Sequence, residues 1–116
     1  MHLPCANYFK EHQYVSQQLS GKQARYLRGL GHHLQPVVLV GKDEITAGLV
    51  SSVDEALELH ELIKIKLQEG CIMDRKDVAS ILAERCGAAI AQILGRTILL
   101  FRSSEKALIT LPKSKQ

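Results

Sequence analysis

Apolar side chains recur every three to four positions in three stretches of the chain, which is the spacing of one face of an α-helix. The first predicted helix begins at Ser20, which can form a capping box with Gln23, and it ends before Pro36. Gly29 and Gly31 weaken this helix. Its apolar face consists of Ala24, Leu27, Leu30 and Leu34.

Two more helices are predicted by the same spacing. Thr46 or Asp43 can cap the second helix, whose core face consists of Leu49, Val50, Val53, Ala56 and Leu57. Asp74 caps the third helix, and Gly87 ends it, as glycine does at a left-handed C-terminal position. The third helix carries inward Val78, Ile81, Leu82 and Cys86.

Strands are predicted between and after these helices. Residues 37–40 form a short apolar run that is typical of a buried strand. Residues 62–67 alternate, with isoleucine and leucine on one face and Lys64 and Lys66 on the other. Residues 88–94 and 97–101 form two strands joined only by Gly95 and Arg96, so they make a hairpin.

The order of elements is helix, strand, helix, strand, helix, strand, strand. Strands separated by helices favour parallel crossovers, whereas the closing hairpin is antiparallel. We therefore expect a single-domain α/β protein with a mixed four-stranded sheet packed with helices. Residues 1–18 are expected to form an extension outside the core, residues 19–103 the domain, and residues 104–116 a basic C-terminal tail.

Length and composition limit the class of protein. The chain has 116 residues, 46% of them hydrophobic, which is enough for one domain with a substantial core. No apolar run approaches the roughly 20 residues that span a bilayer, and residues 1–18 lack the pattern of a secretory signal. Three cysteines, Cys5, Cys71 and Cys86, lie far apart and without metal-ligand spacing. We expect a cytoplasmic protein with no membrane partner, disulfide or metal.

The distribution of charged residues along the chain is more informative than the net charge of +3. The first helix carries three cations, Lys22, Arg25 and Arg28, whereas the second carries four carboxylates, Asp54, Glu55, Glu58 and Glu61. This pattern predicts a basic and an acidic side, and binding follows the local field. The alternative is that all of these are ordinary solvated faces, and Lys64 and Lys66 could likewise only keep an exposed sheet face soluble.

The stretch from Leu34 to Lys42 favours phosphate as a ligand. An apolar strand runs directly into Gly41 and Lys42 at the entrance of the next helix. Glycine lets the backbone approach a ligand closely, a helix N-terminus offers unpaired N–H groups, and lysine adds positive charge. The signal is weak by itself, because a glycine after a strand is most often a turn.

Catalysis, by contrast, finds no support in the sequence. His32 and His33 are adjacent and would not aim at one metal, His60 falls near an apolar stripe, and Cys86 fills core space. No glycine-rich nucleotide loop is present. We expect no enzyme activity, no cofactor and no small-molecule substrate.

Nucleic-acid binding is better supported than catalysis, and the residues favour a particular mode of binding. The expected core holds only two aromatic residues, Tyr26 and Phe101, which disfavours a platform that stacks several bases. Recognition would rest on phosphates, RNA shape and at most one stacked base.

Three longer segments show a family resemblance. Residues 19–42 read LSGKQARYLRGLGHHLQPVVLVGK, residues 58–66 read ELHELIKIK, and residues 95–102 read GRTILLFR. In this order they resemble the CRM domain (chloroplast RNA splicing and ribosome maturation), over about residues 19–103, and a single copy with short flanks resembles its bacterial, YhbY-like branch. The resemblance implies an RNA-binding domain similar in fold to the C-terminal domain of translation initiation factor 3, associated with precursors of the large ribosomal subunit and without catalytic activity.

One departure from the family pattern concerns the loop after the first strand. The family typically carries a G-x-x-G loop there, likened to the backbone clamp of KH domains. Here the loop reads Gly41-Lys42-Asp43-Glu44, so that glutamate replaces the last glycine. A negatively charged side chain at this place should restrict the backbone and repel phosphate, although the acidic pair could instead cap the following helix.

The combined hypothesis is a monomeric, RNA-binding ribosome assembly factor that acts on large-subunit precursor rRNA. The predicted contact residues are Lys22, Arg25, Arg28, Gly41, Lys42, Lys64, Lys66, Arg96 and Arg102. One alternative is a protein-interaction module whose acidic second helix docks on a basic ribosomal protein. Another is a small enzyme of RNA chemistry, which would need a pocket that the sequence does not reveal.

Overall fold

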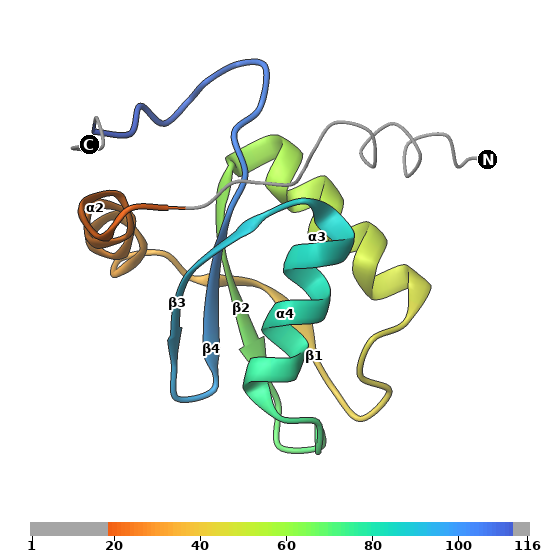
Figure 1. Ribbon diagram of the computed structural model, residues 1–116. Helices are drawn as coiled ribbons and strands as arrows, with labels where there is room; N and C mark the ends of the chain where they lie inside the picture. The colour runs from red at the N-terminus through yellow and green to blue at the C-terminus, as the bar shows by residue number, and fades with distance from the viewer. Residues whose placement is uncertain (1–18, 113–116) are drawn as a thin grey trace.

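A four-stranded sheet with helices on both faces forms the structure, a computed structural model that describes residues 19–112 (Figure 1). The elements are α2 (Gly21–Gly31), β1 (Pro36–Val40), α3 (Ala47–His60), β2 (Leu62–Leu67), α4 (Arg75–Cys86), β3 (Ala89–Leu94) and β4 (Thr97–Phe101). The predicted α/β order of elements is confirmed. The expected extension over residues 1–18 and the end of the tail at residues 113–116 lie outside the described residues.

The sheet is mixed, as predicted. Its strands lie in the order β1-β2-β4-β3, with β1 parallel to β2 and both other pairs antiparallel. The carboxyl ends of β1 and β2 therefore lie at the same end of the sheet as the turn between β3 and β4. A register shift between Ile90 and Gln92 interrupts the pairing of β3 with β4, and the sequence reasoning did not anticipate it.

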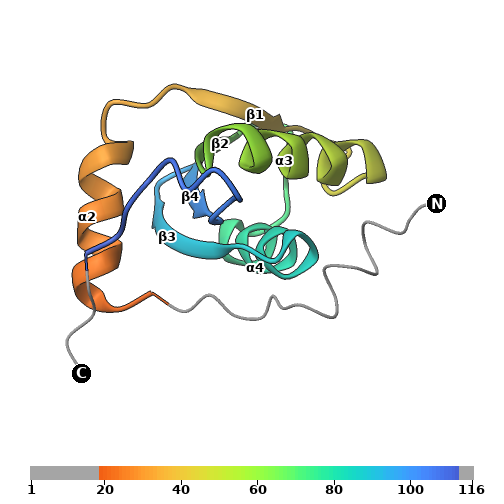
Figure 2. The same cartoon turned by 90° about the horizontal axis from the view of Figure 1, so that it is seen from above.

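The larger part of the core lies between the sheet and the helices α3 and α4, which cover the same face (Figure 2). Ile63, Ile65 and Leu67 of β2 point into this core, in agreement with the predicted alternation. Its other buried residues are Val38, Val40, Val53, Leu57, Val78, Ala79, Leu82, Cys86, Ile98 and Leu100.

Helix α2 lies against the opposite face of the sheet (Figure 2). A smaller core forms there from Leu27, Leu62, Ala91, Leu99 and Phe101. A Cβ atom at Gly31 would come within 2.7 Å of the Leu99 side chain, so glycine permits the close approach of this helix to β4. Leu30, expected on the apolar face of α2, is 39% exposed.

Side chains at the helix ends bind the backbone as predicted. Ser20 and Gln23 form a complete capping box at α2. The hydroxyl of Thr46 accepts a hydrogen bond from the N–H of Leu49, so threonine, not Asp43, caps α3. Asp74 caps α4, and Gly87 ends it in the left-handed conformation at φ 63°. These caps fix where the three helices begin and where α4 ends.

Residues 104–112, expected as part of a basic tail, pack on the domain. Glu61 is completely buried and accepts hydrogen bonds from the N–H groups of Ser104, Leu108 and Ile109 and from the Ser104 hydroxyl. Burial raises the pKa of the Glu61 carboxyl, but these hydrogen bonds outweigh it and hold the pKa below its usual value. Glu61 is therefore a structural residue, which corrects the expectation that it belongs to a solvated acidic face.

Candidate nucleic-acid interface

The part of the sheet face that α2 leaves uncovered carries both lysines of β2. Lys66 is exposed and Lys64 is half-buried. In the strand register, Lys66 lies between Leu39 of β1 and Thr97 of β4, and Thr97 in turn pairs with Leu94 of β3. Leu39 and Leu94 are 52% and 66% exposed. The open face thus combines positive charge with accessible apolar surface.

A depression lies where this face meets α2. Its volume is about 400 Å³, and the side chains that line it include Arg28, Lys64, Gln92, Leu94, Thr97 and Leu99. Arg28 comes from the helix and Lys64 from the sheet, so the fold brings together two predicted cations that are far apart in sequence. We call this the α2 depression.

A second depression of about 480 Å³ lies near the hairpin turn. Lys66 and Arg96 both line it, together with Gln68 and Glu69. The N–H of Leu67 donates to the carbonyl of Arg96 at 2.8 Å, which holds the hairpin turn beside the end of β2. Two further predicted contact residues therefore lie side by side.

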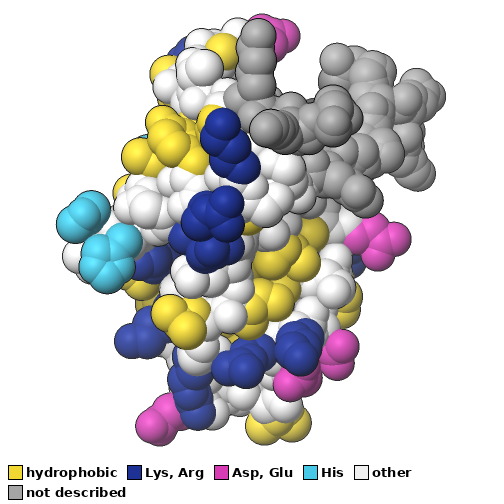
Figure 3. Space-filling view, turned by 60° about the vertical axis from the view of Figure 1, so that its left-hand side comes forward, with side chains coloured by type: hydrophobic (Ala, Val, Ile, Leu, Met, Phe, Trp, Pro, Cys, Tyr) yellow, Lys and Arg dark blue, Asp and Glu magenta, His cyan; other side chains and the backbone are white. Residues whose placement is uncertain are grey.

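Lys22 and Arg25 are exposed on α2. Figure 3 looks onto the side of the molecule that carries this helix, and Lys and Arg side chains occur along it from the helix to the far end of the sheet. Among residues 19–112, the carboxylate ion pairs all involve Arg102, so none of the cations of this side forms an ion pair with an Asp or Glu. Such a surface can bind a polyanion without first breaking internal ion pairs.

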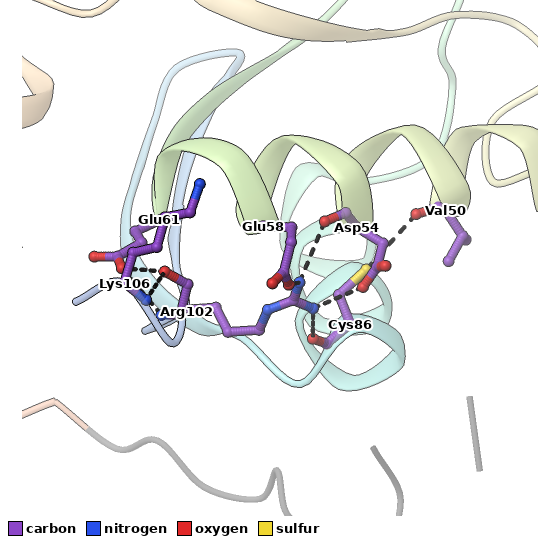
Figure 4. A network of polar contacts seen from close by, with 8 residues as sticks. Val50, Asp54, Glu58, Glu61, Cys86, Arg102 and Lys106 are labelled. Atoms are coloured by element: carbon purple, nitrogen blue, oxygen red, sulfur yellow. Dashed lines mark hydrogen bonds and ion pairs between the residues drawn. The ribbon is translucent and has the colours of Figure 1, made fainter. Parts of the chain in front are cut away.

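Arg102 does not belong to this surface, which corrects its place in the predicted contact set. It is 8% exposed, and its guanidinium donates to Asp54 Oδ1 and to the Cys86 carbonyl at 2.7 Å each (Figure 4). It also donates to the Asp54 carbonyl at 3.2 Å and to Glu58 Oε1 at 3.1 Å. Arg102 joins α3 to the end of α4, so the fold uses its charge internally.

Helix α3, the acidic second helix of the sequence prediction, therefore has fewer unpaired carboxylates than its sequence indicates. Asp54 and Glu58 are paired with Arg102, and Glu61 holds the C-terminal segment. Of the four carboxylates, Glu55 alone has no such contact within the described chain and is exposed. This arrangement speaks against a docking surface for a basic protein on α3.

Residues 19–112 contain no group of three or more His, Cys, Asp or Glu side chains that could hold a metal ion. Burial raises the pKa of the Cys86 thiol to about 12, so this core cysteine stays protonated and unreactive. His60, which the sequence places near an apolar stripe, is exposed. His32 and His33 are also exposed, with their rings edge to face. Across the same residues, no helix combines the length and apolar character needed to cross a bilayer.

Comparison with known proteins agrees with this geometry. Residues 19–102 match the CRS1 / YhbY (CRM) domain. The chain belongs to this family. The match covers the whole sheet and all three helices, so the resemblance noted in the three sequence segments is confirmed.

Relatives of this chain carry names that state RNA binding. The chain is 40% identical over 95 residues to the Probable RNA-binding protein YqeI of Bacillus subtilis, covering 81% of this chain and 99% of that protein. It is 38% identical to an RNA-binding protein of Haemophilus influenzae, covering 82% and 96% of the two chains. A hypothetical protein of Staphylococcus aureus, solved in solution, superimposes with a TM-score of 0.71 at 36% identity and covers 82% of this chain and 100% of its own.

The loop in which this CRM domain departs from the family pattern lies at the carboxyl end of β1. A Cβ atom at Gly41 would come within 3.1 Å of the Gln68 side-chain oxygen, and Lys42 packs beside Gly70. The N–H of Glu44 donates to the carbonyl of Gly41 at 3.0 Å, which closes a turn. Glu44 has φ 56°, a conformation that glycine adopts more readily than other residues.

Gln92, Thr97 and Gly29 were missed by reasoning from the sequence. They lie in the α2 depression, but no charge or motif marks them. Gln92 in particular would face the larger core if β3 alternated regularly, and only the register shift after Ile90 directs it to the α2 side. A bulge of this kind has no reliable sequence signal in a strand of alanine, isoleucine and glutamine.

Proposed function

We propose that this chain binds RNA through the side of the molecule formed by α2, the open sheet face and the β1–α3 loop. The observation that carries the proposal is a set of cations without carboxylate partners among residues 19–112. These cations are Lys22, Arg25, Arg28, Lys42, Lys64, Lys66 and Arg96. Membership of the CRM family, and relatives named as RNA-binding proteins, support the same conclusion.

The composition of the surface defines the mode of binding. Phe101 is buried in the smaller core, and Tyr26 on α2 is 43% exposed, so one described ring is accessible for stacking. The cations would bind phosphates, and Gly41 would let the loop backbone approach the strand. We propose no cofactor and no catalytic step.

In the cell, we propose that the protein acts as a monomeric assembly factor on precursor rRNA of the large ribosomal subunit, in the cytoplasm. The bacterial relatives named as RNA-binding proteins support the RNA-binding part of this role. The domain would hold an rRNA segment until RNA folding or a ribosomal protein displaces it.

Ultraviolet crosslinking in living cells, followed by sequencing of the attached RNA, tests this role. Reads concentrated on one region of large-subunit rRNA and enriched in precursor sequence are the expected result. Reads in proportion to RNA abundance would leave a general RNA-binding protein and contradict the assembly role. An absence of crosslinks above background would contradict RNA binding itself.

A further inference from the structure

The α2 depression has a composition that phosphate binding alone does not explain. Its volume of about 400 Å³ falls in the range of roughly 300–1,000 Å³ that is typical of small-ligand sites. Leu94, which is 66% exposed, supplies apolar surface, and Gln92 and Thr97 supply neutral hydrogen-bonding groups. A nucleobase needs both kinds of surface, one for its ring and one for the donors and acceptors on its edge.

The bulge in β3 is what brings Gln92 to this place. Ile90 pairs with Leu100 and points into the larger core, whereas Gln92 pairs with Leu99 on the α2 side. Ala91 between them lies in the smaller core, so two consecutive residues, Ala91 and Gln92, face the same side of the sheet. Bulges commonly redirect a side chain near a functional site. Here the redirected group is an amide, which can both donate and accept.

Gly29 has no packing reason to be glycine. It lines the α2 depression, and a Cβ atom there would meet nothing within 4 Å. Its neighbour Gly31 differs, because Leu99 occupies the space of its missing side chain. A glycine inside a helix lowers helix stability relative to alanine. At Gly29 the missing side chain widens the α2 depression.

Cations lie beside the proposed base site. Arg28 and Lys64 line the same depression, and no Asp or Glu does. Neither cation forms an ion pair with a carboxylate of the described chain. A phosphate adjoining a bound base would meet positive charge on two sides.

We propose that the α2 depression binds one unpaired RNA nucleotide. Its base lies against Leu94 with its edge at Gln92 and Thr97, and its phosphate lies between Arg28 and Lys64. The inference rests on the proposed RNA binding and adds to it a preference for unpaired RNA and for particular bases. A base inside a duplex could not enter, because its edge is paired and its faces are stacked.

Fluorescence anisotropy with short homopolymeric RNA strands of A, C and U, and with an A–U duplex of equal length, tests the inference on the full chain. We expect the protein to prefer single strands and to favour one base by about three- to tenfold, the effect of one or two hydrogen bonds. Gln92→Ala and Gly29→Ala should abolish the base preference, while Gly29→Ala raises the melting temperature. Gly48→Ala is the matched control, because Gly48 lies in α3 on the other side of the sheet and a Cβ atom there would meet only the Thr46 hydroxyl, at an ordinary contact distance of 3.9 Å.

The possible failures are distinguishable. Tight, salt-sensitive binding without base preference, or a preference that survives Gln92→Ala, would overturn the nucleotide site and leave RNA binding standing. Failure of every strand to bind at low salt would overturn the proposed function, and this inference with it. A lower melting temperature in Gly29→Ala would show that glycine is required for packing and would remove the argument from that residue.

Discussion

At the scale of single residues, Glu44 occupies a backbone position that disfavours its side chain. Its φ of 56° lies in the left-handed region, which costs an ordinary L-residue about 1–2 kcal/mol. Its carboxylate also lies in the same short loop as Lys42, where we propose that phosphate binds. Both effects point the same way, because glycine would relieve the strain and remove the repulsion.

Glu44→Gly is therefore expected to raise RNA affinity by about two- to fivefold at low salt, as a repulsive charge is removed. It should not lower the free energy of unfolding, because relief of strain offsets the greater freedom of the unfolded chain. Anisotropy titration and urea unfolding measure the two quantities. Glu44→Gln is the control that removes charge but keeps the strain. Unchanged affinity in both variants would place this loop outside the RNA site.

Arg102 and Arg96 differ in role although both are arginines near the hairpin. Arg102→Ala should lower the free energy of unfolding by about 2–3 kcal/mol, because it leaves the Cys86 carbonyl and Asp54 without their hydrogen-bond donor. The loss should be smaller than for a fully buried ion pair, because the carboxylates are partly exposed. Arg96→Ala should leave stability unchanged and weaken RNA binding. Chemical unfolding and anisotropy on both variants check this. The reverse pattern would contradict our assignment of both residues.

At the scale of elements, Glu61 connects the end of α3 to the C-terminal segment. Folding lowers the pKa of the Glu61 carboxyl, so its ionised form stabilises the protein at pH values above the ordinary pKa of 4.5. This stabilisation is lost as the pH falls through the lower pKa of the folded state. Glu61→Gln should cost about 2 kcal/mol at pH 7, the range for hydrogen bonds to a charged group. The difference from wild type should shrink in acid. Urea unfolding at a series of pH values measures this difference in stability, and Glu55→Gln, at an exposed position, is the control. A difference that does not change with pH would exclude the ionised carboxylate as the source of the stabilisation.

The elements themselves were largely predictable from the sequence, because local signals and packing agree. Ser20, Asp74 and Gly87 mark helix ends by chemistry that acts over a few residues, and the alternation of β2 reports directly which face is buried. The bulge in β3 and the docking of residues 104–112 were not predictable. Both depend on contacts between segments distant in sequence, such as that of Glu61 with Ile109.

The candidate site was predictable only in part, for the same reason. Charge identifies cations, but it does not distinguish Arg96, which is exposed, from Arg102, which is used inside the fold. Neutral residues such as Gln92 carry no signal until the strands are placed beside each other. A sequence of this kind therefore predicts where positive charge is available better than it predicts what the surface can recognise.

At the scale of the whole molecule, the sheet separates two sides of different character. On one side α3 and α4 cover the larger core, and the acidic residues of α3 are partly neutralised by Arg102. On the other side the cations of α2 and β2 lack such partners within residues 19–112. RNA should consequently bind one side only, which makes the location of a charge matter more than the number of charges.

The salt dependence of binding tests this asymmetry. If four to six phosphates are bound, the logarithm of affinity should fall against the logarithm of salt concentration with a slope of about −3 to −4, at about 0.7 for each phosphate of a single strand. Removing three cations of α2 in Lys22→Ala/Arg25→Ala/Arg28→Ala should make the slope shallower by about 2. The control removes two cations of α4, on the other side of the sheet, in Lys76→Ala/Arg85→Ala, and should leave the slope unchanged. An equal change for each charge removed in the two variants would mean that net charge, not the α2 side, attracts RNA.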